Sequence, residues 1–145
     1  MVNSDRELTI REARDDEEFG AWLSELIRED AEDSAAGLEE RHLVLTDEIG
    51  DWIGGLRYTL RGGVASIVEI GVTRAERGRG HALRLLEAFE RAAAENGAHV
   101  LEFWTDSLAI EPLLAAFGWR RITSRPDYIT RQEWHLLEKR LAPGA

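Results

Sequence analysis

One short stretch near the middle of the chain combines residues suited to binding an anion. A hydrophobic segment, residues 64–72, leads into it, and a pattern typical of an α-helix begins at Ala82. Between them lies a hexad of Arg77, Gly78, Arg79, Gly80, His81 and Ala82. A strand that turns directly into a helix leaves backbone N–H groups free at the positive end of the helix dipole. Arginines beside free amides form a receptor for a group such as pyrophosphate.

The first helical turn after this hexad carries no acidic residue, although Asp and Glu are favoured there. An acidic side chain would itself occupy the free amides, and Gly78 and Gly80 lack a Cβ that would hold a phosphate away from them. The alternative is an ordinary turn with its arginines in solvent. A nucleotide phosphate loop needs Gly-Lys-Ser or Gly-Lys-Thr, which is absent, and a dinucleotide fingerprint needs glycine at Leu83.

The flanking sequence predicts the elements that position this stretch. Residues 8–13 alternate apolar and polar residues as a strand does, and residues 15–30 carry apolar residues at helical spacing. Residues 31–40 form an acidic connector with room for a short second helix. Three further strands are predicted at 41–46, 52–60 and 64–72. The short turns between them contain glycine, which predicts an antiparallel meander.

A different alternation follows the meander. Apolar residues at helical spacing from Ala82 predict a helix that is capped near Gly97. A strand at 98–105, a short helix at 112–118 and strands at 119–124 and 132–141 complete the chain. We therefore expect an α/β fold in a single domain over residues 1–145, with a mixed, largely antiparallel central sheet of about seven strands flanked by helices.

Composition limits the partners. The 145 residues include 18 basic and 28 acidic residues, and the net charge of -10 disfavours nucleic acid and anionic membranes. Cysteine is absent, which excludes disulfides and thiolate metal sites, and the four histidines lack the spacing of a metal site. No apolar stretch approaches the ~20 residues that span a bilayer, and the opening "MVNSDRELTI" has no basic start followed by an apolar run, so we expect no secretion signal. We expect a cytoplasmic monomer or homodimer without a metal.

Two segments resemble the GNAT superfamily of N-acetyltransferases. Residues 68–97 resemble its acyl-CoA-binding motif, whose core of Arg or Gln, two variable residues, Gly, one variable residue and Gly or Ala matches Arg77 to Ala82. Residues 113–122, "LLAAFGWRRI", resemble a later segment of the family. The resemblance implies an enzyme that moves an acetyl group from acetyl-CoA directly to a primary amine of a small molecule or peptide. The alternative is a non-catalytic module that binds acyl-CoA or a protein.

The resemblance also implies which residues bind acetyl-CoA. The backbone of residues 70–72 would pair with the pantetheine arm, and the amides of residues 79–82 would hold the pyrophosphate. Ser107 corresponds to an Asn that is common in the turn before the later helix. The expected cofactor-binding residues are Ile70, Gly71, Val72, Arg77, Gly78, Arg79, Gly80, His81, Ala82 and Ser107.

Catalysis requires an uncharged amine, whereas a lysine-like ammonium has a pKa roughly three units above neutrality. Glu69 is the candidate base, because strict alternation places it with Ile67 and Gly71 on one face of its strand. Alternatively, Glu69 forms an ion pair with Arg57. The tyrosine that many GNAT members use as an acid is replaced by Leu114. Tyr128 is therefore the candidate acid, or else an aromatic residue that packs over the sheet.

The acceptor is predicted from charge alone. Residues 1–50 hold 16 acidic residues and 5 arginines. In the family, the segment after the first strand borders the acceptor groove, which favours a cationic amine as the acceptor. The alternative is an acidic helix face that keeps the protein soluble. Trp52, Trp104 and Trp119 are predicted at strand ends, where they are candidates for lining an acceptor pocket.

Overall fold

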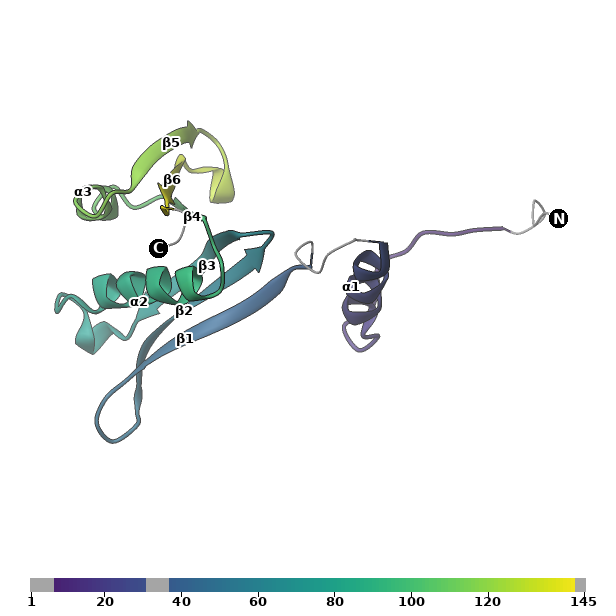
Figure 1. Cartoon of the computed structure of the whole chain (residues 1–145), viewed down its shortest axis with the longest axis horizontal. Helices are drawn as coiled ribbons and strands as arrows, with labels where there is room; N and C mark the ends of the chain where they lie inside the picture. The colour runs from purple at the N-terminus through teal and green to yellow at the C-terminus, as the bar shows by residue number, and fades with distance from the viewer. Residues whose placement is uncertain (1–6, 31–36, 143–145) are drawn as a thin grey trace.

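The computed structural model describes residues 7–30 and 37–142. Within them, six strands form one mixed sheet in the order β1-β2-β3-β4-β6-β5 (Figure 1). All neighbours are antiparallel except β3 and β4, which are parallel. The strands are β1 (Glu39–Thr46), β2 (Trp52–Arg61), β3 (Val64–Val72), β4 (Val100–Thr105), β5 (Arg120–Arg125) and β6 (Trp134–Arg140). The mixed, largely antiparallel sheet is confirmed.

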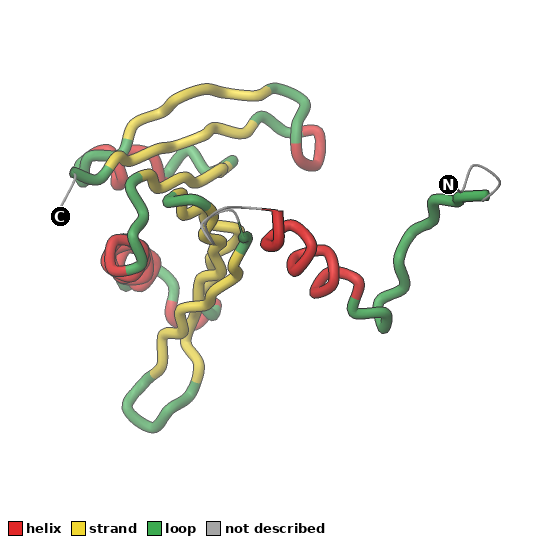
Figure 2. The backbone as a smooth tube through the Cα atoms, turned by 45° about the vertical axis from the view of Figure 1, so that its right-hand side comes forward, coloured by secondary structure: helices red, strands yellow, loops and turns green. Residues whose placement is uncertain are grey.

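Three α-helices and two short 3-10 turns accompany the sheet. The helices are α1 (Phe19–Asp30), α2 (His81–Glu95) and α3 (Ile110–Ala115), and the turns are η2 (Arg74–Glu76) and η3 (Ile129–Arg131). Figure 2 shows α2 against one side of the sheet and α1 away from it. None of the helices in residues 7–30 and 37–142 is long and apolar enough to cross a bilayer.

The strand predicted at residues 8–13 is wrong. These residues have no regular secondary structure, and the side chains of Leu8 and Ile10 are exposed. Alternation of apolar and polar residues produces a strand only where a neighbouring strand supplies hydrogen bonds and a buried face. Among the described residues no strand pairs with this segment, and their sheet has six strands instead of about seven.

Helix α1 forms where the apolar spacing predicts it, but its apolar side is not buried. Its five large apolar side chains are between 40% and 58% exposed: Phe19, Trp22, Leu23, Leu26 and Ile27. In Figures 1 and 2, α1 lies apart from the sheet at the end of an N-terminal arm. The short second helix predicted within 31–40 falls largely on residues 31–36, which lie outside the described residues.

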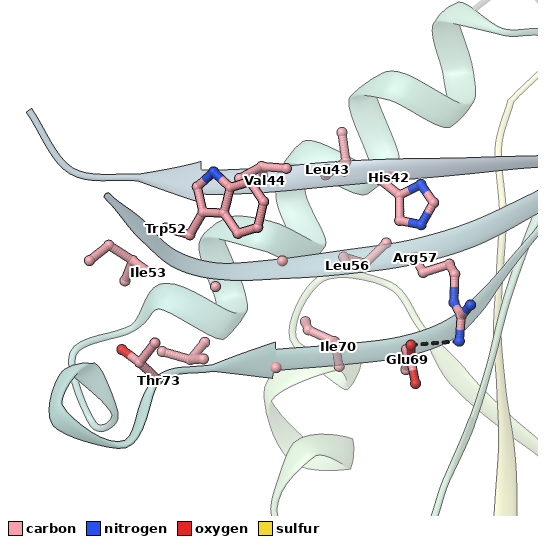
Figure 3. Close-up of a pocket in the computed structure, with 14 residues that line it drawn as sticks. His42, Leu43, Val44, Trp52, Ile53, Leu56, Arg57, Glu69, Ile70 and Thr73 are labelled. Atoms are coloured by element: carbon pink, nitrogen blue, oxygen red, sulfur yellow. Dashed lines mark ion pairs between the residues drawn. The ribbon is translucent and has the colours of Figure 1, made fainter. Parts of the chain in front are cut away.

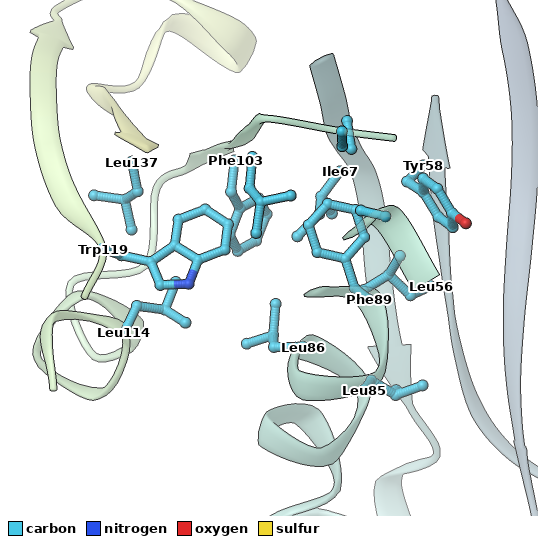
Figure 4. Packing of buried hydrophobic residues seen from close by; sticks show 14 of the residues in the cluster. Leu56, Tyr58, Ile67, Leu85, Leu86, Phe89, Phe103, Leu114, Trp119 and Leu137 are labelled. Carbon is cyan, nitrogen blue, oxygen red and sulfur yellow. The ribbon is translucent and has the colours of Figure 1, made fainter. Parts of the chain in front are cut away.

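Helix α2 covers one face of the sheet and forms the core with it. Its side chains at helical spacing are fully buried: Leu85, Leu86, Phe89 and Ala93. They pack against side chains of β2, β3 and β4, and the Phe89 ring contacts the Tyr58 ring edge to face at 5.1 Å (Figure 4). Trp119 belongs to the same core beside Leu114 and Leu137, so it does not line an acceptor pocket.

A bulge in β3 changes which side chains share a face. Arg57 pairs with Glu69 but Tyr58 pairs with Ile67, so Val68 is the extra residue. Ile67 and Ile70 therefore both face α2, and strict alternation wrongly placed Ile67 with Glu69. Glu69 points to the opposite face, which is not covered by α2. We call it the open face; it carries His42, Arg57, Glu69, Trp104 and Leu136.

The bulge also marks the point where two strands separate. β3 and β4 pair only from Val64 to Ile67 and from Val100 to Phe103. Beyond Ile67, the second half of β3 continues to pair with β2 but has no partner on the β4 side. The backbone of residues 68–72 therefore faces a gap between β3 and β4 without pairing to β4.

Candidate functional site

The start of α2 is open to an external anion. Gly78 and Gly80 have φ of 78° and 81°, the left-handed region that favours glycine. Gly80 caps the helix without a side-chain hydrogen bond, and the first turn has no acidic residue. The first helical bond runs from Arg84 N to Gly80 O at 3.1 Å, so the amides of residues 81–83 have no acceptor inside the helix. The helix start thus has free amides and left-handed glycines, and anion binding there stays a prediction.

The Glu76 carboxylate lies beside this helix start, although the first turn of the helix itself carries no acidic residue. Glu76 Oε1 lies 3.2 Å from His81 Nε2 and 3.7 Å from an Arg79 guanidinium nitrogen. The His81 side chain is only 15% exposed, and its buried Nδ1 atom has no hydrogen-bond partner among the described residues. Glu76 therefore holds the His81 ring at the helix start and partly offsets the positive charge of Arg79.

Arg77 has a different contact from its neighbours in the hexad. Its Nε atom donates a hydrogen bond to the Val72 carbonyl oxygen at 3.0 Å. This bond ties the loop to the end of β3, and it occupies one of the backbone groups that the resemblance assigns to pantetheine. Arg77 therefore fixes the loop between the strand and the helix in this structure.

The gap between β3 and β4 lies next to the helix start. Ile70 and Val72 pair with β2 and direct half-buried side chains toward the core. Gly71 lies between them, and a Cβ built on it would meet no atom within 4 Å. The space beside Gly71 is on the open face, whereas the side of residues 70–72 that faces β4 is free of strand pairing.

The far side of the gap is the turn after β4. There the Ser107 N–H donates to the Thr105 hydroxyl at 3.0 Å, which closes the turn that leads into α3. Arg121 of β5 donates two hydrogen bonds to Glu111 of α3. The Arg121 guanidinium lowers the pKa of the Glu111 carboxyl below its ordinary value. This ion pair fastens α3, and with it the Ser107 turn, to the sheet.

Glu69 forms the ion pair with Arg57 that the sequence left as an alternative. Its Oε1 atom lies 2.6 Å from the Arg57 guanidinium, yet its side chain remains 66% exposed (Figure 3). The pair lines a cavity of about 590 Å³ on the open face. Gly54, Gly55 and Gly71 line the cavity without side chains, and exposed Trp52 lines it as well. The carboxylate is fixed in place and remains accessible to a ligand.

Comparison with known proteins shows to which family this chain belongs. The family model described as "Acetyltransferase (GNAT) family" matches residues 8–119. The chain belongs to this family. It is therefore an acyltransferase. No curated protein matches the sequence.

Solved structures similar to this GNAT chain share its fold. A provisionally named acetyltransferase from Agrobacterium tumefaciens has a TM-score of 0.71 at 21% identity, over 94% of this chain and all (100%) of that one. An acetyltransferase from Bacillus cereus has a TM-score of 0.69 at 23% identity, over 92% and 98%. A GNAT family acetyltransferase from Elizabethkingia anophelis, with acetyl-CoA bound, has a TM-score of 0.65 at 16% identity, over 70% and 76%.

In this GNAT domain, Tyr128 packs over the sheet, which is the alternative to a role as the acid. Its ring centre lies 5.3 Å from that of Trp104, and the Arg125 guanidinium lies 4.7 Å above the Tyr128 ring and 5.8 Å from the Trp104 ring. Trp104 was singled out from the sequence as a candidate for the acceptor pocket. Arg125 was not, because an arginine at a strand end has no distinctive spacing; only the folded sheet brings it to the two rings.

The acidic residues within 7–30 do not line the cavity on the open face of this GNAT structure. Helix α1 lies apart from the sheet, so its carboxylates do not line the cavity beside Glu69 (Figure 1). A cationic acceptor thus remains a prediction that rests on charge alone. In the described parts of the chain, 7–30 and 37–142, no three His, Asp or Glu side chains gather as metal ligands do.

Proposed function

We propose that this GNAT acyltransferase uses acetyl-CoA and moves its acetyl group directly to a primary amine of a small molecule or peptide. The observation that carries the proposal is that the start of α2 and the second half of β3 both open onto the gap between β3 and β4. The uncapped start of α2 offers amides and Arg79 to the pyrophosphate, and the unpaired half of β3 offers its backbone to the pantetheine arm. The acetyl-CoA bound to the structural neighbour from Elizabethkingia anophelis supports the same use of the fold.

The acceptor amine approaches from the open face, where Glu69 is accessible beside the cavity. Its nitrogen attacks the thioester carbonyl carbon, so that a C–N bond forms and the C–S bond breaks. Glu69 takes the proton that the amine loses, directly or through a water molecule. Arg57 keeps the Glu69 carboxylate in one position, and therefore acts as a positioning residue.

The departing thiolate needs a proton, and Tyr128 is our candidate donor. A thiol has a pKa near 8.5 and leaves more easily than an amine, so a dedicated acid adds little at neutral pH. Tyr128→Phe removes the hydroxyl and keeps the ring over Trp104. We expect this variant to lower kcat by less than about tenfold, below the range of an essential general acid.

The proposal is tested by release of free CoA thiol from acetyl-CoA in the presence of a panel of primary amines. We expect release that depends on both the amine and the protein, together with acetylated amine in the mass spectrum. Thermal melting with CoA is measured in parallel, because binding of CoA raises the melting temperature whether or not a suitable amine is present. Absence of any stabilisation by millimolar CoA would overturn the proposal.

A further inference from the structure

We propose that the acceptor carries a carboxylate as well as an amine, and that Arg125 binds this carboxylate. The inference rests on the proposed function, because it names the acceptor of the same site. The geometry that points to it is the cluster of Arg125, Tyr128 and Trp104 on the open face, called the Arg125 cluster below.

The Arg125 cluster lies across the gap from Glu69. The last β3–β4 pair is Ile67 with Phe103, and both side chains face the core. On β4, Trp104 follows Phe103 and points to the open face. On β3, Glu69 follows the bulge residue Val68 and also points to the open face. The two side chains therefore flank the gap between β3 and β4 from opposite strands on one face.

Arg125 reaches the same face from β5, which is separated from β4 by β6. It lies opposite Trp134 in the β5–β6 register, and Trp104 lies opposite Leu136. Between Trp134 and Leu136, the buried side chain of His135 points to the other face. All members of the Arg125 cluster thus border the open face on the far side of the gap from the proposed base.

The charge of Arg125 is not neutralised by the protein. Arg125 forms no ion pair with any residue in the described ranges 7–30 and 37–142, whereas the nearby Asp127 carboxylate pairs with Arg131 at 3.3 Å. The aromatic faces of Tyr128 and Trp104 hold the guanidinium through cation–π contacts. Such contacts position an arginine and leave its N–H groups free to donate to an anion.

The loop that carries Tyr128 is itself fixed. The Trp134 indole N–H donates to the Ile129 carbonyl oxygen at 2.8 Å, and the Tyr128 amide donates to the Gln132 carbonyl oxygen at 2.9 Å. These bonds hold the Tyr128 ring beneath the guanidinium. The Arg125 cluster is therefore a preorganised element, even though Arg125 is exposed.

The chemistry of the cluster selects an amino-acid-like acceptor. A guanidinium donates two parallel hydrogen bonds to a carboxylate, and the adjoining rings favour an apolar group beside it. An acceptor with its amine in the gap, joined to Glu69 through water, and its carboxylate on Arg125 would be an amino acid or a short peptide with an apolar side chain. A polyamine would instead meet the unpaired positive charge of Arg125.

The test compares matched acceptors. Phenylalanine, leucine and methionine are each assayed against their primary amides, in which the carboxylate is replaced by a neutral group. We expect kcat/KM for the acids to exceed that for the amides by about tenfold or more, as for loss of one charged hydrogen-bonded contact. Arg125→Gln should reduce this preference to near unity. Arg120→Gln, on the same strand but paired with Glu138, should preserve it.

Binding of the acetylated product tests the inference even if no acceptor is turned over. N-acetylphenylalanine and its amide are titrated calorimetrically into the protein saturated with CoA. We expect tighter binding of the acid to the wild type and equal binding to Arg125→Gln. Equal use and equal binding of acids and amides by the wild type, or an unchanged preference in Arg125→Gln, would overturn the inference. The proposed function would survive that result, since it fails only if CoA does not bind or no amine is acetylated.

Discussion

The Arg57 guanidinium lies 2.6 Å from Glu69 Oε1, at the step of the β2–β3 ladder where Val68 forms a bulge. The bulge turns Glu69 to the open face and, at the same step, β3 separates from β4. One local irregularity thus produces both the gap that we assign to acetyl-CoA and the orientation of the proposed base. The active-site proposal rests on this coincidence.

Glu69→Gln should lower kcat by about a hundredfold or more at neutral pH, because general bases contribute ~10²–10⁴-fold. CoA binding should be unchanged, since Glu69 faces away from the helix start. The deficit should shrink as the pH approaches the pKa of the amine, about 10.4 for a lysine-like amine, where a base is no longer needed. Initial rates of thiol release across pH measure this effect.

Glu40→Gln is the matched control, because Glu40 lies on the open face 4.0 Å from the same arginine. It should retain wild-type activity. An equal loss in both variants would show that the Arg57 ion-pair network, and not a base at Glu69, limits the rate.

Gly80→Asp should weaken CoA binding by about tenfold or more, equivalent to losing ~1.5 kcal/mol of charged hydrogen bonding. The aspartate would cap the free amides and repel the pyrophosphate, and the left-handed φ of 81° adds strain for a residue with a Cβ. Calorimetric titration of CoA gives the dissociation constant. Arg91→Glu, a charge reversal further along α2, should bind CoA as the wild type does; equal weakening in both would contradict a local anion site.

Gly71→Val should reduce kcat/KM for the acceptor while leaving CoA affinity intact. A side chain at Gly71 would extend into the cavity on the open face, whereas the backbone that faces the gap would keep its position. Thr59 lies on β2 and also faces the open face, but it does not line the cavity. Thr59→Val should therefore change neither kcat/KM for the acceptor nor the affinity for CoA. Unaltered acceptor kinetics in Gly71→Val would mean that the amine does not pass through this cavity.

The sequence predicted most of the fold correctly, because the relevant signals are local. The spacing of Leu85, Leu86 and Phe89 specifies a helix with one buried face, and the Gly62-Gly63 turn specifies a hairpin. The segment around Leu8 and Ile10 failed because a strand depends on a partner elsewhere in the chain, which alternation cannot reveal.

The uncapped helix start at Gly80 was predicted, since a missing acidic residue is visible in the sequence, but the contacts of Glu76 and Arg77 beside it were not. The Arg57–Glu69 pair was foreseen as an alternative, but the bulge at Val68 was not, because no residue type marks it. The contact of Arg125 with Tyr128 depends on the β5–β6 register and on the loop between these strands. Contacts of that kind emerge only in the folded sheet.

Because the apolar side of α1 is exposed, we expect α1 to contribute little to the free energy of unfolding. Phe89→Ala, in the core, should lower the free energy of unfolding by ~3–5 kcal/mol. Leu26→Ala, on the exposed side of α1, should change it by less than about 1 kcal/mol, since little apolar area is lost and alanine favours a helix. Urea denaturation measures both. A comparable loss in Leu26→Ala would mean that α1 packs against other apolar surface in solution.

The most direct test of the acetyl-CoA site is amide chemical-shift mapping of the 145-residue protein by NMR during titration with CoA. We predict that the largest changes fall on two segments that border the same gap, residues 70–72 at the end of β3 and residues 78–82 at the start of α2. Arg91 and the exposed residues of α1 should serve as unshifted references. Changes confined to residues outside both segments, or none at millimolar CoA, would contradict the proposed site.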